Sequence, residues 1–118
     1  MIVSRGDVVI ALFPHASGSG SKPRPVPVVQ SDVYNTKLQN LIVAAITTNL
    51  KHAADPASVS IDVATPEGKQ SGLTQNSIVT CVNLATIDGS LAAKRIGRLP
   101  PALMQRVDAS LKAALALP

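Results

Sequence analysis

Arg24 stands between Pro23 and Pro25, directly after a glycine- and serine-rich loop over residues 15–23. The two prolines restrict the backbone on both sides of the arginine, so its side chain would be positioned at low entropic cost. A guanidinium stays charged at working pH and matches phosphate oxygens with a planar fork of donors. The stretch therefore predicts either an ordinary surface arginine at the start of a strand or a fixed binding point for an anion.

Hydroxyl and carboxylate side chains are the next candidates. Thr47 and Thr48 end the most apolar segment of the chain, at a point where core meets solvent, although threonine is also common in strands for its shape alone. Asp88 follows a predicted strand and precedes Gly89, which is typical of a turn residue or a helix cap. The same carboxylate could pair with Arg24 or accept a proton.

Histidine can act as an acid or a base near neutral pH, so His15 and His52 are each either a candidate acid or base or a solvated loop residue. RNA carries its own nucleophile, the 2′-hydroxyl. A protein can cleave it by holding the phosphodiester, stabilising charge on phosphorus and moving two protons. Arg24, Thr47 and either Asp88 or His15 would form such a set if they converge in space.

Other reaction classes lack their motifs. The sequence contains no nucleophile elbow, HExxH or phosphate-binding loop, and no carboxylate cluster predicts a divalent metal site. Cys81 is the only cysteine, which excludes an internal disulfide and a cysteine-based metal site and suits a reducing cytoplasm. We therefore expect no metal and no cofactor.

Composition indicates one small domain over residues 1–118. The chain is 46% hydrophobic and 15% charged, with a net charge of +4 and a pI of about 9.7. A basic domain favours nucleic acid, an anionic membrane or an acidic protein as partner. The N-terminus does not resemble a signal peptide, and the longest apolar run, residues 41–46, is too short to span a membrane.

Hydrophobic patterns predict several short strands and one helix. The polar connection over 32–40 has room for one helical turn capped by Ser31 or Asp32, and residues 64–72 read as a turn. Leu103, Val107 and the residues that follow at the same spacing form an apolar stripe on a terminal helix that begins near Pro100 and Pro101. We expect a mainly β fold, a small curved barrel with this helix packed on it. The predicted strands are 7–14, 24–31, a central buried 41–48, 57–63, 76–87 as one or two strands, and 94–99.

Five segments in this order resemble the MazF/PemK (Kid) family of toxin endoribonucleases. The resemblance implies an SH3-like β-barrel with a C-terminal α-helix, a homodimer, and metal-independent cleavage of single-stranded RNA at short sequences, usually in mRNA. It also implies a cognate antitoxin protein whose disordered acidic tail blocks the RNA groove. The single cysteine and the absence of a signal peptide lead us to expect a cytoplasmic protein. The segments are "RGDVVIALFP" (5–14), "GSGSKPRPVPVVQSD" (18–32), "LIVAAITTN" (41–49), "GLTQNSIVTCVNLATID" (72–88) and "RIGRL" (95–99).

Family roles transfer to matching positions. The arginine of the family's "RP" motif matches Arg24, the threonine of its "IT" motif matches Thr47, and the aspartate of its "TID" motif matches Asp88. Arg24 would stabilise the scissile phosphate, and the general base stays open between Asp88 and His15. The next hydroxyl residue of the family motif matches Thr48, and we expect RNA contacts from Lys22, Thr48, Lys51 and Thr86.

Three positions depart from the family pattern. Ala85 stands where some members carry an arginine, the loop over 18–23 lacks the carboxylate that many members have there, and Pro27 interrupts a strand. The first two keep a second interpretation open, a non-catalytic RNA- or antitoxin-binding module of the same fold. A gyrase-poisoning toxin on a similar barrel is a third, which the ending "ALALP" disfavours because that group ends in Trp-Gly-Ile.

Overall fold

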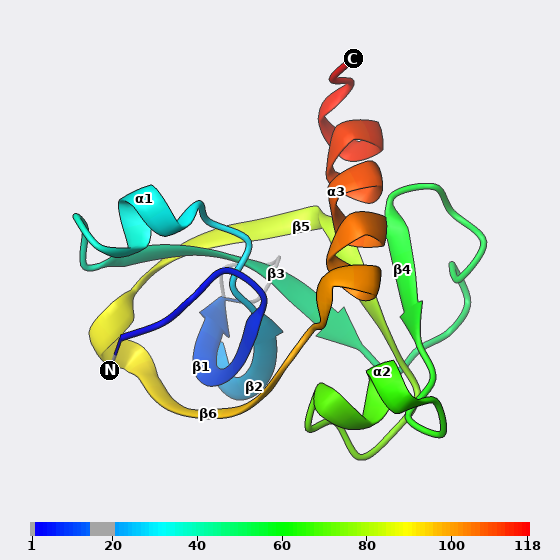
Figure 1. Ribbon diagram of the computed structural model, residues 1–118, viewed down its shortest axis with the longest axis horizontal. Coiled ribbons are helices and arrows are strands. Elements are labelled where there is room, and N and C mark those ends of the chain that lie inside the picture. The colour runs from blue at the N-terminus through cyan, green and yellow to red at the C-terminus, as the bar shows by residue number, and fades with distance from the viewer. Residues whose placement is uncertain (1, 15–20) are drawn as a thin grey trace.

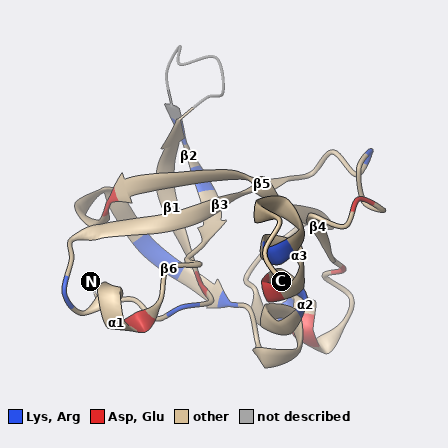
Figure 2. Cartoon of the chain, turned by 90° about the horizontal axis from the view of Figure 1, so that it is seen from above, with Lys and Arg blue, Asp and Glu red and all other residues tan. Residues whose placement is uncertain are grey.

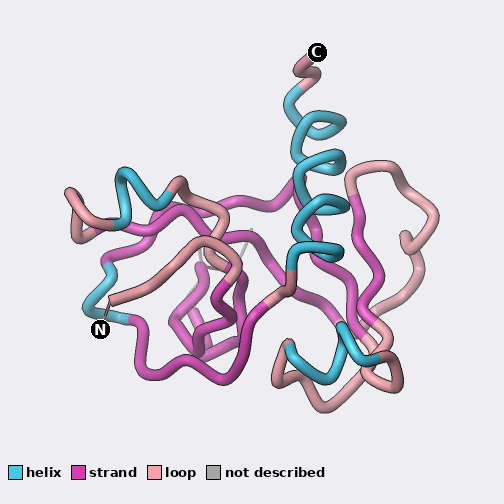
Figure 3. The backbone as a smooth tube through the Cα atoms, viewed as in Figure 1, coloured by secondary structure: helices cyan, strands magenta, loops and turns pink. Residues whose placement is uncertain are grey.

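The computed structural model describes residues 2–14 and 21–118 as six strands and a C-terminal helix, with short helical segments between them (Figure 1). Figure 3 shows that the helical segments lie at the periphery of the strands. No helix in this described part of the chain is long and apolar enough to cross a membrane. The elements are β1 (Asp7–Pro14), β2 (Ser21–Pro27), α1 (Asp32–Asn35), β3 (Asn40–Thr47), β4 (Ser58–Ile61), α2 (Pro66–Gln70), β5 (Ser77–Asp88), η1 (Gly89–Leu91), β6 (Ala92–Arg98) and α3 (Pro101–Leu115).

The strands form two antiparallel three-stranded sheets, with the orders β2-β1-β6 and β3-β5-β4. An isolated bridge between Val28 and Val43 connects the end of β2 to β3. The mainly β fold with a C-terminal helix is therefore confirmed. The hydrogen-bonded pairing does not close into a ring in the described residues, so the predicted barrel is not confirmed.

Several element boundaries differ from the sequence prediction. The strand predicted over 24–31 begins at Ser21 and ends at Pro27, which has no N–H to continue the ladder. The predicted turn over 64–72 contains α2, because Thr65 caps it by accepting a hydrogen bond from the Gly68 amide and Pro66 suits its first turn. At α1, Ser31 rather than Asp32 provides the cap, accepting from the Val33 amide.

Strand β3 is not the central strand that its apolar sequence predicted. β5 occupies the centre of that sheet, and Ile42 of β3 is 37% exposed. β3 is apolar on both faces for another reason: Leu41 and Val43 belong to one core cluster, whereas Ala44 and Ile46 belong to the other. A single strand that passes between two clusters has to be apolar on both sides.

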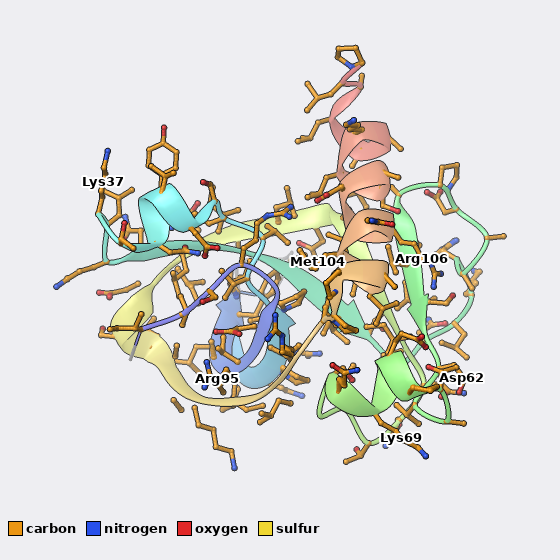
Figure 4. The ribbon with its side chains drawn as sticks, viewed as in Figure 1. Lys37, Asp62, Lys69, Arg95, Met104 and Arg106 are labelled. Atoms are coloured by element: carbon orange, nitrogen blue, oxygen red, sulfur yellow. The ribbon has the colours of Figure 1, made fainter. Side chains whose placement is uncertain are left out.

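Helix α3 packs its apolar stripe on β4 and β5 (Figure 1). Leu103 and Val107 are buried, Leu111 is half-buried and Leu115 at the far end is exposed. Figure 4 shows Met104 on the side of α3 that faces the strands. The helix is joined to the N-terminal segment by an ion pair of 2.8 Å between Arg5 and Asp108.

Candidate functional site

Arg24 projects from the outer strand of its sheet into a pocket. It pairs opposite Ala11 in β1, and Pro23 and Pro25 flank it within β2 as the sequence indicated. Lys22 lies two residues away on the same face of the strand and is exposed, whereas Val26, two residues in the other direction, is buried. Strand alternation thus places Arg24 where the core ends and solvent begins, with a basic neighbour on the solvent side.

Thr47 lies at the end of β3 and lines the same pocket as Arg24. This pocket has a volume of about 320 Å³, and Phe13 and Thr80 contribute to its walls. Arg24 and Thr47 also line another opening, of about 230 Å³, to which Thr48 contributes. The Thr47 hydroxyl accepts a hydrogen bond of 3.1 Å from the Asn49 amide, which leaves its own proton to donate to a ligand.

The electrostatics of the pocket favour an anion. No carboxylate lines either opening around Arg24 among the residues that the structure describes. The ion pairs within this part of the chain are Arg5 with Asp108 and Arg95 with Asp7, and Arg24 takes part in neither. A half-buried guanidinium beside a hydroxyl donor is an arrangement suited to binding phosphate oxygens.

A family model described as the PemK-like, MazF-like toxin of type II toxin–antitoxin systems matches residues 4–115. The chain belongs to this family. It is 36% identical over 118 residues to the endoribonuclease EndoA of Bacillus subtilis, covering 99% of this chain and 97% of that protein. It is 34% identical over 119 residues to the endoribonuclease MazF6 of Mycobacterium tuberculosis, covering 99% and 100%.

Solved structures agree with this membership. The Mycobacterium tuberculosis toxin MazF-mt6 superposes with a TM-score of 0.75 at 26% identity, over 95% of this chain and 98% of that one. A mycobacterial endoribonuclease in complex with its cognate antitoxin superposes with a TM-score of 0.76 at 23% identity, over 98% and 97%. The latter comparison shows a shared fold. The resemblance found in the five sequence segments is therefore confirmed.

Asp88 does not lie in the Arg24 pocket. In the ladder between β3 and β5, Asp88 pairs opposite Asn40, whereas Thr47 pairs opposite Ile78 at the other end of β3. The Asp88 carboxylate accepts a hydrogen bond of 2.9 Å from the Ser90 amide and caps η1. Hydrogen bonds from Ser90 lower the pKa of Asp88, which makes its carboxylate a weaker base near neutral pH.

The remaining predicted site residues are spread over the surface. Thr86 is exposed on β5 opposite Ile42, and Lys51 is exposed in the connection between β3 and β4. His15 lies outside the described residues. Within residues 2–14 and 21–118, no group of three or more His, Cys, Asp and Glu side chains is arranged to hold a metal ion.

Sequence reasoning missed two polar residues that line the pocket, Thr80 and Asn83. Thr80 borders a bulge in β5 and Asn83 lies within it: Ala44 pairs with Leu84 and Ala45 with Thr80, so the three residues between Thr80 and Leu84 have no partner in β3. A bulge re-aims side chains next to the ladder. Asparagine within an otherwise apolar strand disfavours regular pairing, so Asn83 was the sequence signal that could have located the bulge.

Proposed function

We propose that this protein is a metal-independent endoribonuclease, the toxin of a type II toxin–antitoxin system, that cuts single-stranded mRNA by 2′-hydroxyl transesterification at short, specific sequences. The observation that carries the proposal is that Arg24 and Thr47 line one pocket to which no carboxylate of residues 2–14 and 21–118 contributes. The endoribonuclease names of EndoA and MazF6, relatives over the full chain, support the reaction class.

The pocket suits the charge changes of this reaction. The 2′-oxygen attacks phosphorus, the bond from phosphorus to the 5′-oxygen breaks, and the products carry a 2′,3′-cyclic phosphate and a 5′-hydroxyl. Arg24 and the Thr47 hydroxyl would donate to the non-bridging oxygens, where negative charge grows in the transition state. No metal is required, because RNA supplies the nucleophile and the protein supplies the donors.

Two protons must also move, one from the 2′-hydroxyl and one to the 5′-oxygen. Our candidates for this transfer remain Asp88 and His15. Asp88 would have to reach the reaction from the opposite end of β3 while it caps η1. The assignment of the base is therefore a separate question from the assignment of the phosphate-binding pair.

We further propose that the protein acts as a homodimer in the cytoplasm, where mRNA is translated, and is held inactive by a cognate antitoxin. A structural relative at 23% identity is described in complex with its cognate antitoxin, and this supports the partner class. Figure 2 shows lysine and arginine segments on β2 and β6 of one sheet. Such segments would attract both RNA and the acidic tail of an antitoxin. Lys22, Thr48, Lys51 and Thr86 are the proposed RNA contacts.

Cleavage of a long single-stranded RNA in excess EDTA tests the proposal. Wild type should cut at one short motif, and Arg24→Ala should be slower by about 100- to 1000-fold, the usual loss of one transition-state donor. Arg24→Lys should recover little, since lysine lacks the fork. Arg106→Ala is the matched control, because Arg106 is exposed on α3 (Figure 4) and does not line the Arg24 pocket.

The outcomes separate the candidates. Wild-type rates in Arg24→Ala would refute the site, and loss of cleavage in EDTA would refute the metal-independent mechanism. Folded, antitoxin-free protein that binds RNA and leaves it intact would favour the non-catalytic module instead. In that case Ala85, half-buried opposite Val43, would be the first position to replace with arginine.

A further inference from the structure

A second pocket adjoins the Arg24 pocket and shares Thr47 and Thr80 with it. It has a volume of about 290 Å³. Its apolar walls are Ile78 and Val82, and polar side chains from the connection between β3 and β4 complete it. Apolar walls with a few placed polar groups are the usual composition of a small-molecule or base-binding site.

A phosphate held by Arg24 and Thr47 would bring its neighbouring nucleotide to the wall that the two pockets share. We propose that the second pocket binds the base of the nucleotide next to the scissile phosphate, and that Asn49 and Asp55 select guanine there. This inference rests on the proposed function and specifies its substrate. The selection follows from which hydrogen-bonding atoms the two side chains have left to offer.

Asn49 offers a donor. Its Oδ1 accepts a hydrogen bond of 3.0 Å from the Lys51 amide, so the Nδ2 end remains for a ligand. The backbone amide of Asn49 donates to the Thr47 hydroxyl at 3.1 Å. This bond fixes the position of Asn49 relative to the phosphate pocket.

Asp55 offers an acceptor. Its Oδ1 accepts from the Ala57 amide at 2.8 Å, which leaves Oδ2 for a ligand. An ionised carboxylate accepts and does not donate, and it repels phosphate. Beside the proposed phosphate site, its free oxygen would instead bind base N–H groups with charge-assisted hydrogen bonds.

Guanine matches this donor and acceptor best. Its Watson–Crick edge presents two adjoining donors, N1–H and N2–H, to a carboxylate, and its O6 lies beside them for the Asn49 amide. Adenine and cytosine present a single amino group next to a ring acceptor that would face the carboxylate, and uracil presents one N–H between two carbonyl oxygens. Bases of single-stranded RNA are read on this edge.

His52 supplies a flat surface for the same base. It lines the pocket together with Asn49 and Asp55. Unstacked bases pack on aromatic or imidazole faces, and the chain has few such faces, with Phe13 and Tyr34 as its only large aromatic residues. Phe13 lines the Arg24 pocket and Tyr34 lies on α1, so neither lines this one.

The test is cleavage of a randomised single-stranded RNA by wild type, Asp55→Asn and Asp62→Asn, with the cut ends sequenced. Asparagine at 55 can keep the bond from the Ala57 amide, while its free end changes from acceptor to donor. Asp62 is the matched control, since its Oδ1 accepts from the Ala64 amide at 2.9 Å in the same way, but it lines a different pocket, with Arg106. Figure 4 shows Asp62 close to α2.

We expect wild type and Asp62→Asn to require guanine adjacent to the cut, and Asp55→Asn to lose about tenfold of that preference. Inosine, which lacks the N2 amino group, should slow wild type by about fivefold when it replaces that guanine, and should not slow Asp55→Asn. Equal melting temperatures of wild type and the two variants would show that the change lies in base recognition and not in stability.

Two results would overturn the inference in distinguishable ways. Cleavage by wild type without a guanine preference next to the cut, or with one that Asp55→Asn retains, overturns this assignment and leaves the nuclease standing. Absence of cleavage by folded, antitoxin-free wild type overturns the proposed function and the inference with it.

Discussion

The hydroxyl of Thr47 is the part of the proposed phosphate site that a single isosteric change can remove. Thr47→Val keeps the branched side chain that suits the end of β3 and deletes the hydroxyl that would donate to a phosphate oxygen. Thr47→Ser does the reverse, since it keeps the hydroxyl and removes a methyl group. The pair of variants therefore separates hydrogen bonding from packing.

The magnitude follows from the bond that is lost. A hydrogen bond to a charged group contributes about 1.5–3 kcal/mol, which corresponds to about 10- to 150-fold in rate if the bond forms in the transition state. The cost in stability should be smaller. The Asn49 amide loses its acceptor at 3.1 Å, but it lies on an exposed loop where water can replace the hydroxyl, so we expect less than about 1 kcal/mol.

The assay is kcat/KM on a short RNA that contains one mapped cut site, together with thermal melting of each variant. Thr36→Val is the matched control, because the Thr36 hydroxyl also makes a local hydrogen bond, to the Val33 carbonyl at 2.9 Å, and Thr36 caps the C-terminus of α1 outside the pocket. A folded Thr47→Val protein within twofold of wild type would refute the reasoning. So would a Thr47→Ser protein as slow as Thr47→Val.

Three further predictions concern stability, pH and salt. Gly97→Ala should lower the free energy of unfolding by about 3 kcal/mol in denaturant titrations, because its Cβ would lie 2.4 Å from backbone atoms of Gln70 and Ser71; a loss below 1 kcal/mol would contradict the contact. Burial raises the pKa of Cys81 to about 11, so the unfolded chain releases this proton at lower pH than the folded chain. The free energy of unfolding should therefore fall between about pH 9 and pH 11 in wild type, and fall less in Cys81→Ala. Equal slopes of the free energy of unfolding against pH in the two proteins would contradict this. Lys22→Ala should weaken binding of all RNA sequences alike and reduce the slope of log affinity against log salt concentration by about one, measured by titrating a labelled RNA at several salt concentrations. An unchanged slope would place Lys22 away from the RNA phosphates.

Local patterns in the sequence predicted the elements that depend on local chemistry. β1 and α3 follow from the apolar run that ends at Pro14 and from the i, i+4 stripe that begins at Leu103. The same holds for Arg24 and Thr47, which the structure brings into one pocket because β2 and β3 meet at the Val28–Val43 bridge. Their roles toward RNA remain predictions.

Long-range register was beyond the sequence pattern. The composition of β3 suggested a central strand, since a pattern of apolar residues cannot distinguish burial within one core from passage between two. To predict whether Asp88 lies near Arg24, one must know which end of β5 pairs with which end of β3. Nothing in the residues around Asp88 encodes that pairing, because it is set by the strands on either side.

The proposed site is built from the irregular parts of the two sheets. Prolines hold Arg24 on the outer strand β2, and the bulge that begins after Thr80 in β5 turns Asn83 toward the pocket while Cys81 stays in the core. Regular pairing would have alternated these positions strictly between core and solvent. Substitutions in the regular ladder should therefore act mainly through stability, whereas those at the β2 edge, the β5 bulge and the connection after β3 should act on RNA. On this proposal, a substitution at these irregular positions would change RNA recognition without repacking either core cluster.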